Sequence, residues 1–167
     1  MPKTLALTIA ILSMFLAQCG ITPKAKDTHV YEKVNLTFFA GGSCEPCKKE
    51  LPLVRDRLAE LGVDRDRVQV QVYLTLGKFF GPVQPGDTQK FQQDHGLPAE
   101  FEMLEDNKCP DNGVYKKYYP NDRCAIPRTV IRTPDGEQIA IFKPKNKAEE
   151  MVDDIMVKLK DVLKGEK

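Results

Sequence analysis

The chain has 167 residues, with 25 lysine and arginine residues against 24 aspartate and glutamate residues, and it contains five cysteines. This length fits one domain that buries enough apolar surface to be stable without disulfides. A charge balance so close to neutral argues against nucleic acid as a partner and against a polybasic membrane patch.

The N-terminal residues are typical of an export signal. Lys3 is followed by an apolar run over residues 5–17 that is broken only by Thr8 and Ser13. A membrane-spanning helix needs about 20 such residues, so the run has the length of a signal-peptide core instead. An uncleaved N-terminal anchor and a conventional cleavage nearby are the alternatives. The signal peptide and both alternatives place the domain outside the cytoplasm.

The end of this segment, Leu16-Ala17-Gln18-Cys19, resembles the lipobox of bacterial lipoproteins. The resemblance implies that residues 1–18 are a signal peptide and that Cys19 carries the lipid after cleavage. Residues 19–31 would then form the lipidated cysteine and a polar tether, and residues 32–167 would form the domain. We therefore expect a bacterial lipoprotein anchored to a membrane and facing the periplasm or the cell exterior.

The rest of the chain alternates between strand and helix patterns. Apolar residues in period two indicate strands, and apolar residues three or four apart indicate amphipathic helices. Pro52 lies inside the first helix and should kink it. The strict alternation at 68–76 predicts a half-buried strand. The expected elements are strands at 34–39, 68–76, 100–104, 128–132 and 138–142, and helices at 46–61, 87–95, 112–118 and 146–163. This order predicts an α/β fold, a mixed sheet with helices on both faces.

Two cysteines stand where the first strand gives way to the first helix. If Cys19 carries lipid, four cysteines remain, and an even number in an oxidising compartment suggests two disulfides. Cys44 follows a glycine turn at the start of the helix, where free backbone N–H groups and the helix dipole favour a thiolate. Cys44 is therefore the expected nucleophile, and Cys47, one turn later, is expected to attack the mixed disulfide that Cys44 forms.

Glu50 lies three residues after Cys47 and hence on the same face of the helix. A carboxyl group beside the sulfurs could hold or deliver a proton while Cys47 titrates. The spacing alone favours the alternative, a surface carboxylate that the helix dipole stabilises.

Residues 44–52, CEPCKKELP, closely resemble the active-site helix of exported thioredoxin-like reductases of the ResA and TlpA type, and the resemblance extends over most of residues 32–163. It implies a thioredoxin-like mixed sheet with the extra helix–strand insertion of the TlpA-like group, between Asp87 and Leu104. It also implies that Glu50 is functional. Ile126-Pro127 corresponds to the family's cis-proline dipeptide, which packs against the sulfurs and presents backbone to the substrate.

The resemblance assigns catalytic roles to Cys44, Cys47, Glu50 and Pro127, and substrate binding to Ile126, Arg128 and Ser43. Two of these positions depart from the family pattern. Ser43 stands where tryptophan usually precedes the first cysteine, and Arg128 stands where threonine is common after the proline. These changes concern recognition of the substrate rather than the chemistry of the sulfurs.

Cys109 and Cys124 bracket an insertion-like segment just before Pro127. A structural disulfide between them would contribute about 3 kcal/mol by restricting the unfolded chain. The alternative is that Cys124, three residues before Pro127, lies close enough to Cys44 and Cys47 to exchange with them.

The family resemblance implies an extracytoplasmic thiol–disulfide oxidoreductase. Its substrates would be protein thiols or disulfides, and a membrane thiol donor would supply electrons. ResA-like relatives act on apocytochrome c thiols, which makes these the best single substrate expectation. We expect a monomer with no cofactor and no metal site.

Two other classes of function are alternatives to an oxidoreductase. A copper chaperone could bind Cu(I) through Cys44 and Cys47, although related Sco-type chaperones have a longer cysteine spacing and a distal histidine. A redox-inert binding module would have no need to keep Cys44, Cys47, Pro52 and Pro127 together.

Overall fold

The computed structural model describes residues 30–164 except 108 and 110. The expected signal peptide, the lipidation site Cys19 and nearly all of the tether lie outside the described residues. Within the described part of the chain, no helix is both long and apolar enough to cross a membrane.

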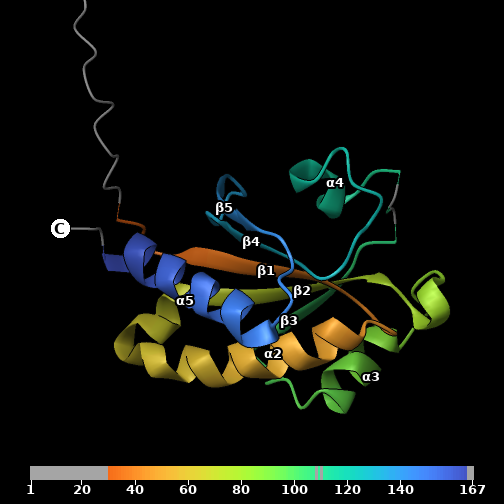
Figure 1. The fold of residues 1–167 in the computed structure, drawn as a ribbon, viewed down its shortest axis with the longest axis horizontal. Coiled ribbons are helices and arrows are strands. Elements are labelled where there is room, and N and C mark those ends of the chain that lie inside the picture. The colour runs from red at the N-terminus through yellow and green to blue at the C-terminus, as the bar shows by residue number, and fades with distance from the viewer. Residues whose placement is uncertain (1–29, 108, 110, 165–167) are drawn as a thin grey trace, which may run out of the picture.

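A five-stranded mixed sheet forms the centre of the molecule, in the order β3-β2-β1-β4-β5 (Figure 1). The strands are β1 (Val34–Gly41), β2 (Val68–Leu76), β3 (Glu102–Glu105), β4 (Arg128–Arg132) and β5 (Gln138–Phe142). β1 pairs in parallel with β2 and antiparallel with β4, so the first strand of the domain is also the central one. β3 runs parallel to β2, and β5 completes an antiparallel hairpin with β4.

Helices cover both faces of this sheet (Figure 1). α2 (Glu45–Leu58), α3 (Asp87–Asp94) and α5 (Ala148–Lys164) contribute to one apolar core, whereas the short α4 (Val114–Tyr118) belongs to a second cluster on the other face. Two 3₁₀ segments, η1 (Ala59–Arg67) and η2 (Lys78–Phe80), flank β2. The structure confirms the predicted α/β sheet with helices on both faces.

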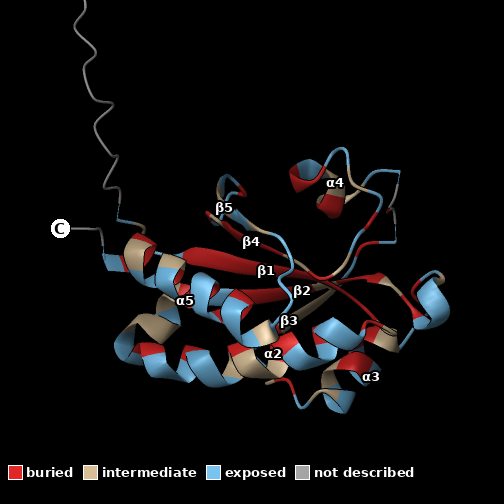
Figure 2. Ribbon diagram, viewed as in Figure 1, coloured by how far each residue is buried: buried red, intermediate tan, exposed pale blue. Residues whose placement is uncertain are grey.

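Successive side chains of β1 point alternately to the two faces of the sheet, as the pleat of a strand requires. Leu36 and Phe38 join the larger core with α2 and α5, and Phe39 points to the face that α4 covers. There the Phe39 ring lies 5.2 Å from the ring of Tyr115, edge to face. All eight residues of β1 are buried, and Figure 2 shows the strand red throughout.

The structure differs from the sequence-based expectation at two elements. The α-helix expected to reach Leu61 ends at Leu58, and a 3₁₀ segment follows in which Gly62 has φ 59°. β2 is not half-buried as predicted, because Gln71 and Thr75 on its polar face are also buried. The Gln71 side chain donates to Glu102 at 2.7 Å and accepts a hydrogen bond from Arg132, so a polar network covers that face.

Candidate active site

Cys44 and Cys47 lie at the junction of β1 and α2, as expected. Gly42 N–H donates to the Leu76 carbonyl at 2.9 Å, and Cys44 N–H donates to the Gly41 carbonyl at 3.0 Å, which closes the turn after β1. Cys44 is the N-cap of α2, with extended backbone, and its Sγ accepts a hydrogen bond from Cys47 N–H at 3.2 Å. The two cysteines are disulfide-bonded, with Cα atoms 5.3 Å apart.

The position of Cys44 favours a negative charge on its sulfur once the bond is reduced. The N-cap position presents the unpaired N–H groups and the positive end of the helix dipole to that atom. Both sulfurs are well covered, but Cys44 is 4% exposed and Cys47 is 1% exposed. Both residues are buried to nearly the same extent, so the N-cap position, and not exposure, distinguishes Cys44 from Cys47.

Glu50 is a buried carboxyl group on α2, one turn beyond Cys47. Its side chain is 2% exposed, and its Oε2 has no hydrogen-bond partner among the described residues. Burial raises the pKa of Glu50 from 4.5 to about 7, because an apolar environment disfavours the charged form. The surface-carboxylate interpretation is therefore wrong, and Glu50 is able to exchange a proton near neutral pH.

Ile126 and Pro127 lie beside the end of β1. The peptide bond between them is cis, as the family resemblance implied. Ile126 packs against the core cluster that contains both cysteines. It also approaches the backbone of Gly41 so closely that a Cβ at Gly41 would lie 2.4 Å from Ile126 Cδ1, so the glycine makes this contact possible.

No protein-family model and no curated protein sequence matches this chain. Solved structures do match. A secreted Mycobacterium tuberculosis disulfide oxidoreductase homologous to E. coli DsbE is 19% identical, with TM-score 0.54 over 78% of this chain and 83% of the other. A Corynebacterium glutamicum thiol-disulfide isomerase is 14% identical, with TM-score 0.58 over 82% and 84%. A thioredoxin-like protein solved in the oxidised form is 15% identical, with TM-score 0.55 over 78% and 79%.

The chain has a thioredoxin-like fold. At these identities the likeness extends to the fold and no further, so membership of the ResA and TlpA type remains a prediction. In this thioredoxin-like fold the two cysteines lie between two flanking regions. The loop with Ile126 and Pro127 enters β4 on one side of β1, and the loop after β2 leads to α3 on the other side.

Several contacts fix the loop before β4. Asp122 accepts from Ala125 N–H at 3.1 Å and from Arg128 Nη2 at 2.7 Å, and Tyr115 OH donates to the Ala125 carbonyl at 2.9 Å. The guanidinium of Arg128, expected to bind substrate, is thus engaged in an internal ion pair in this structure. Its role in recognition remains a prediction.

Cys109 and Cys124 are bonded to each other, with Cα atoms 6.1 Å apart. This is the pairing expected of a structural disulfide, and it joins both ends of the segment that carries α4. Cys124 immediately precedes Ala125, so the bond also ties down the approach to Ile126 and Pro127.

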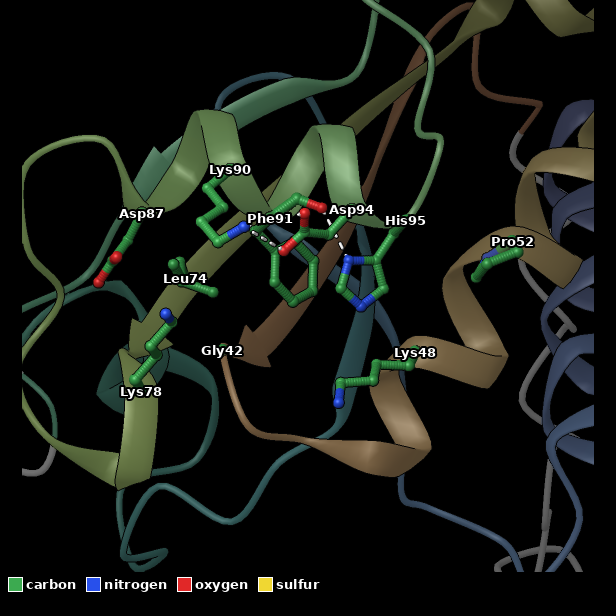
Figure 3. Close-up of a pocket in the computed structure, with 10 residues that line it drawn as sticks. All are labelled: Gly42, Lys48, Pro52, Leu74, Lys78, Asp87, Lys90, Phe91, Asp94 and His95. Carbon is green, nitrogen blue, oxygen red and sulfur yellow. Dashed lines mark hydrogen bonds and ion pairs between the residues drawn. The ribbon is translucent and has the colours of Figure 1, made fainter.

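Two features on the other flank were not predicted from the sequence. The first is η2, where the backbone N–H of Phe79 donates to Ser43 Oγ at 2.9 Å. The second is a cavity of about 430 Å³ between α2, the end of β2 and α3 (Figure 3). Two consecutive phenylalanines in a loop rich in glycine and proline were the available signal for η2. Ser43, which was expected to bind substrate, connects η2 to the turn that carries Cys44.

The described part of the chain holds no group of three or more histidine, cysteine, aspartate or glutamate side chains arranged to bind a metal ion. His95 ends α3 as its C-cap, as predicted. Its Nδ1 lies 2.7 Å from the Phe91 carbonyl, and since a carbonyl only accepts, Nδ1 carries the hydrogen.

Proposed function

We propose that this protein is a thiol–disulfide oxidoreductase that acts outside the cytoplasm on protein thiols and disulfides. The observation that carries the proposal is the position of Cys44 at the N-cap of α2, with its sulfur accepting the Cys47 N–H. The helix start lowers the pKa of a thiol placed there, and a thiolate is the nucleophile in disulfide exchange.

In the reducing direction, exchange takes two displacements. The Cys44 thiolate attacks one sulfur of the client disulfide, forms a mixed disulfide and releases the other client sulfur as a thiolate. Cys47 then loses its proton and attacks Cys44 Sγ. The client leaves with both sulfurs reduced, and two electrons have passed from the Cys44–Cys47 dithiol to the client.

Glu50 is the group we propose to accept the proton of Cys47. It is buried on the same helix one turn away, and with a pKa of about 7 it is partly ionised near neutral pH. A base with a pKa close to the working pH is best suited to take up a proton and then to release it. The second displacement is then the step that depends on Glu50.

The finer parts of the proposal rest on the family resemblance. Lipidation of Cys19 would hold the domain at a bacterial membrane, an upstream membrane thiol donor would restore the dithiol, and apocytochrome c thiols would be the client. These parts are tested in cells, by mass spectrometry of the mature N-terminus and by the identity of captured clients.

The decisive experiment uses Cys47→Ala in the native host. Without Cys47 the mixed disulfide cannot be resolved, so Cys44 should accumulate bonded to its client, which mass spectrometry after non-reducing separation identifies. The matched control is Cys44→Ala/Cys47→Ala, which should capture nothing. If both variants give the same set of bound proteins, the proposed function is wrong.

A further inference from the structure

Two adjacent aromatic side chains project into solvent next to the cysteine turn. Phe79 is 90% exposed and Phe80 is 61% exposed, and they are the only exposed aromatic pair among the residues that the structure describes. Large apolar side chains gain free energy when they are buried. Neighbouring exposed apolar side chains are typical of surfaces that bind another molecule.

The backbone of both residues is also strained. Phe79 has φ 55° and Phe80 has φ 60°, in the left-handed region that bulky side chains rarely adopt. The turn is closed by Gly77 N–H donating to the Gly81 carbonyl at 2.8 Å and by Gly81 N–H donating to the Lys78 carbonyl at 3.1 Å. Strain that is held in place by surrounding contacts is typical of functional segments.

This turn contacts the residues that immediately precede Cys44. Phe79 N–H donates to Ser43 Oγ, and Ser43 immediately precedes Cys44. A Cβ at Gly42 would lie 3.1 Å from the Gly77 carbonyl carbon and 3.2 Å from Lys78 N, so glycine allows the two backbones to meet. The segment that carries the exposed rings therefore contacts the turn that carries the nucleophile.

The cavity beside this turn supplies a concave surface. Leu74, Phe91 and the His95 ring, stacked on Phe91 with ring centroids 4.1 Å apart, make its wall partly apolar. Figure 3 shows the free nitrogen of His95 and the amino groups of Lys48 and Lys78 projecting toward this space. His95 Nε2 is buried without a partner in the described chain, and with Nδ1 protonated it is an acceptor when the ring is neutral.

Some of the charged side chains at the rim of the cavity form ion pairs, and others do not. Lys48 forms an ion pair with Glu45, and Lys90 forms one with Asp94 at 3.0 Å. Two charged groups at the rim form no ion pair with any described residue, Lys78 next to Phe79 and Asp87. The Asp87 carboxylate instead accepts a hydrogen bond from Gln84 N–H at 2.8 Å. The rim thus offers one free ammonium group beside an apolar wall, which complements a carboxylate next to an apolar side chain.

We propose that Phe79, Phe80 and this cavity form a client-docking surface for an extended protein segment with an apolar side chain and a carboxylate near its cysteine. The inference rests on the proposed function and specifies its substrate class. The apolar client side chain covers the exposed rings and enters the cavity, and the carboxylate meets Lys78. The client backbone then crosses the cysteine turn from the side opposite Ile126 and Pro127.

Short peptides with one cysteine bonded to thionitrobenzoate test the proposal, because reduced protein that resolves the bond releases a coloured thiol. One peptide places leucine and glutamate beside the cysteine, a second replaces leucine with asparagine, and a third replaces glutamate with lysine. The wild-type rate constant should be about tenfold higher for the first peptide than for the second, and higher than for the third.

Phe79→Asn/Phe80→Asn should reduce the leucine preference to within about twofold, because asparagine tolerates the left-handed backbone but offers no apolar ring. Lys78→Glu should reverse the preference for glutamate over lysine. The control is Val63→Asn, which removes a side chain that is 92% exposed on η1 and should keep the wild-type preference. Circular dichroism verifies that each variant is folded.

The outcomes separate the two proposals. If wild-type protein reacts with no peptide faster than free cysteine does, the proposed function fails. If it reacts rapidly with all peptides at equal rates, or if the double phenylalanine variant keeps the leucine preference, the docking surface is refuted while the redox function stands. Loss of binding to phosphatidylglycerol vesicles in that variant, with its peptide preference intact, would assign the rings to a membrane and overturn the proposal.

Discussion

Glu50→Gln should change how the stability of the folded protein depends on pH. The carboxyl group of Glu50 is buried on α2, and burial raises its pKa from 4.5 to about 7. In the unfolded chain the group regains its ordinary value, so between these two pH values the folded state binds more protons than the unfolded state. Stability therefore falls as pH rises through this window.

The size of the effect follows from the two pKa values. A carboxyl group whose pKa rises from 4.5 to about 7 on folding costs the folded state about 3 kcal/mol once it is ionised. Well below pH 4.5 the group is protonated in both states and contributes no pH dependence. Well above pH 7 it is ionised in both states, and the cost is complete.

Glutamine has nearly the same shape as glutamate and cannot ionise, so the variant removes this cost. Relative to wild type, Glu50→Gln should gain stability steadily between pH 5 and pH 8, by a total approaching about 3 kcal/mol. Guanidinium unfolding of the oxidised proteins, followed by circular dichroism at each pH, measures the difference. Burying an amide in place of a carboxyl group also changes the free energy of unfolding, but by the same amount at every pH. It therefore does not affect how the difference between the two proteins depends on pH.

Glu149→Gln on α5 controls for the loss of a surface carboxylate, because Glu149 is exposed. A difference between Glu50→Gln and wild type that stays constant from pH 5 to pH 8 would refute the assignment of Glu50 as a buried group that titrates near neutrality. The proton-transfer role proposed for it would then lose its physical basis.

Two further predictions concern the α4 side of the sheet. Cys109→Ala/Cys124→Ala should lower the free energy of unfolding by about 3 kcal/mol while disulfide exchange by the other pair continues, as measured by denaturant unfolding and by reduction of a small disulfide. Gly113→Ala should cost about 2 to 4 kcal/mol, because its φ is 102° and a Cβ would lie 2.1 Å from Asp106 Oδ1. Gly62→Ala, where φ is 59° and the space is open, should cost only about 1 kcal/mol, and equal losses at the two glycines would contradict the steric explanation.

The sequence predicted most elements because their signals are local. Apolar spacing located β1, β2 and α5. The cysteine pair was equally visible, since a glycine turn followed by a helix start is a local pattern with a direct electrostatic consequence. The ends of several elements moved by a few residues, as at Leu58, where the chain tightens into a 3₁₀ segment.

The remaining features depend on neighbours that are distant in sequence. Spacing placed Glu50 on the face of Cys47, but its burial depends on how the rest of the fold packs around α2. The alternation of residues in β2 predicted that one face of the strand is exposed to solvent. In the structure, Arg132 from β4 and Glu102 from β3 cover Gln71 on that face. Phe79 and Phe80 would be assigned to a core on hydrophobicity alone, and only the folded chain shows that they face solvent.

The strand order bears on how the molecule assembles during synthesis. The central strand, β1, is made first, but its antiparallel neighbour β4 lies in the last third of the chain, so the sheet cannot close until that part has left the ribosome. Cys44 and Cys47 therefore emerge together, well before Cys109 and Cys124.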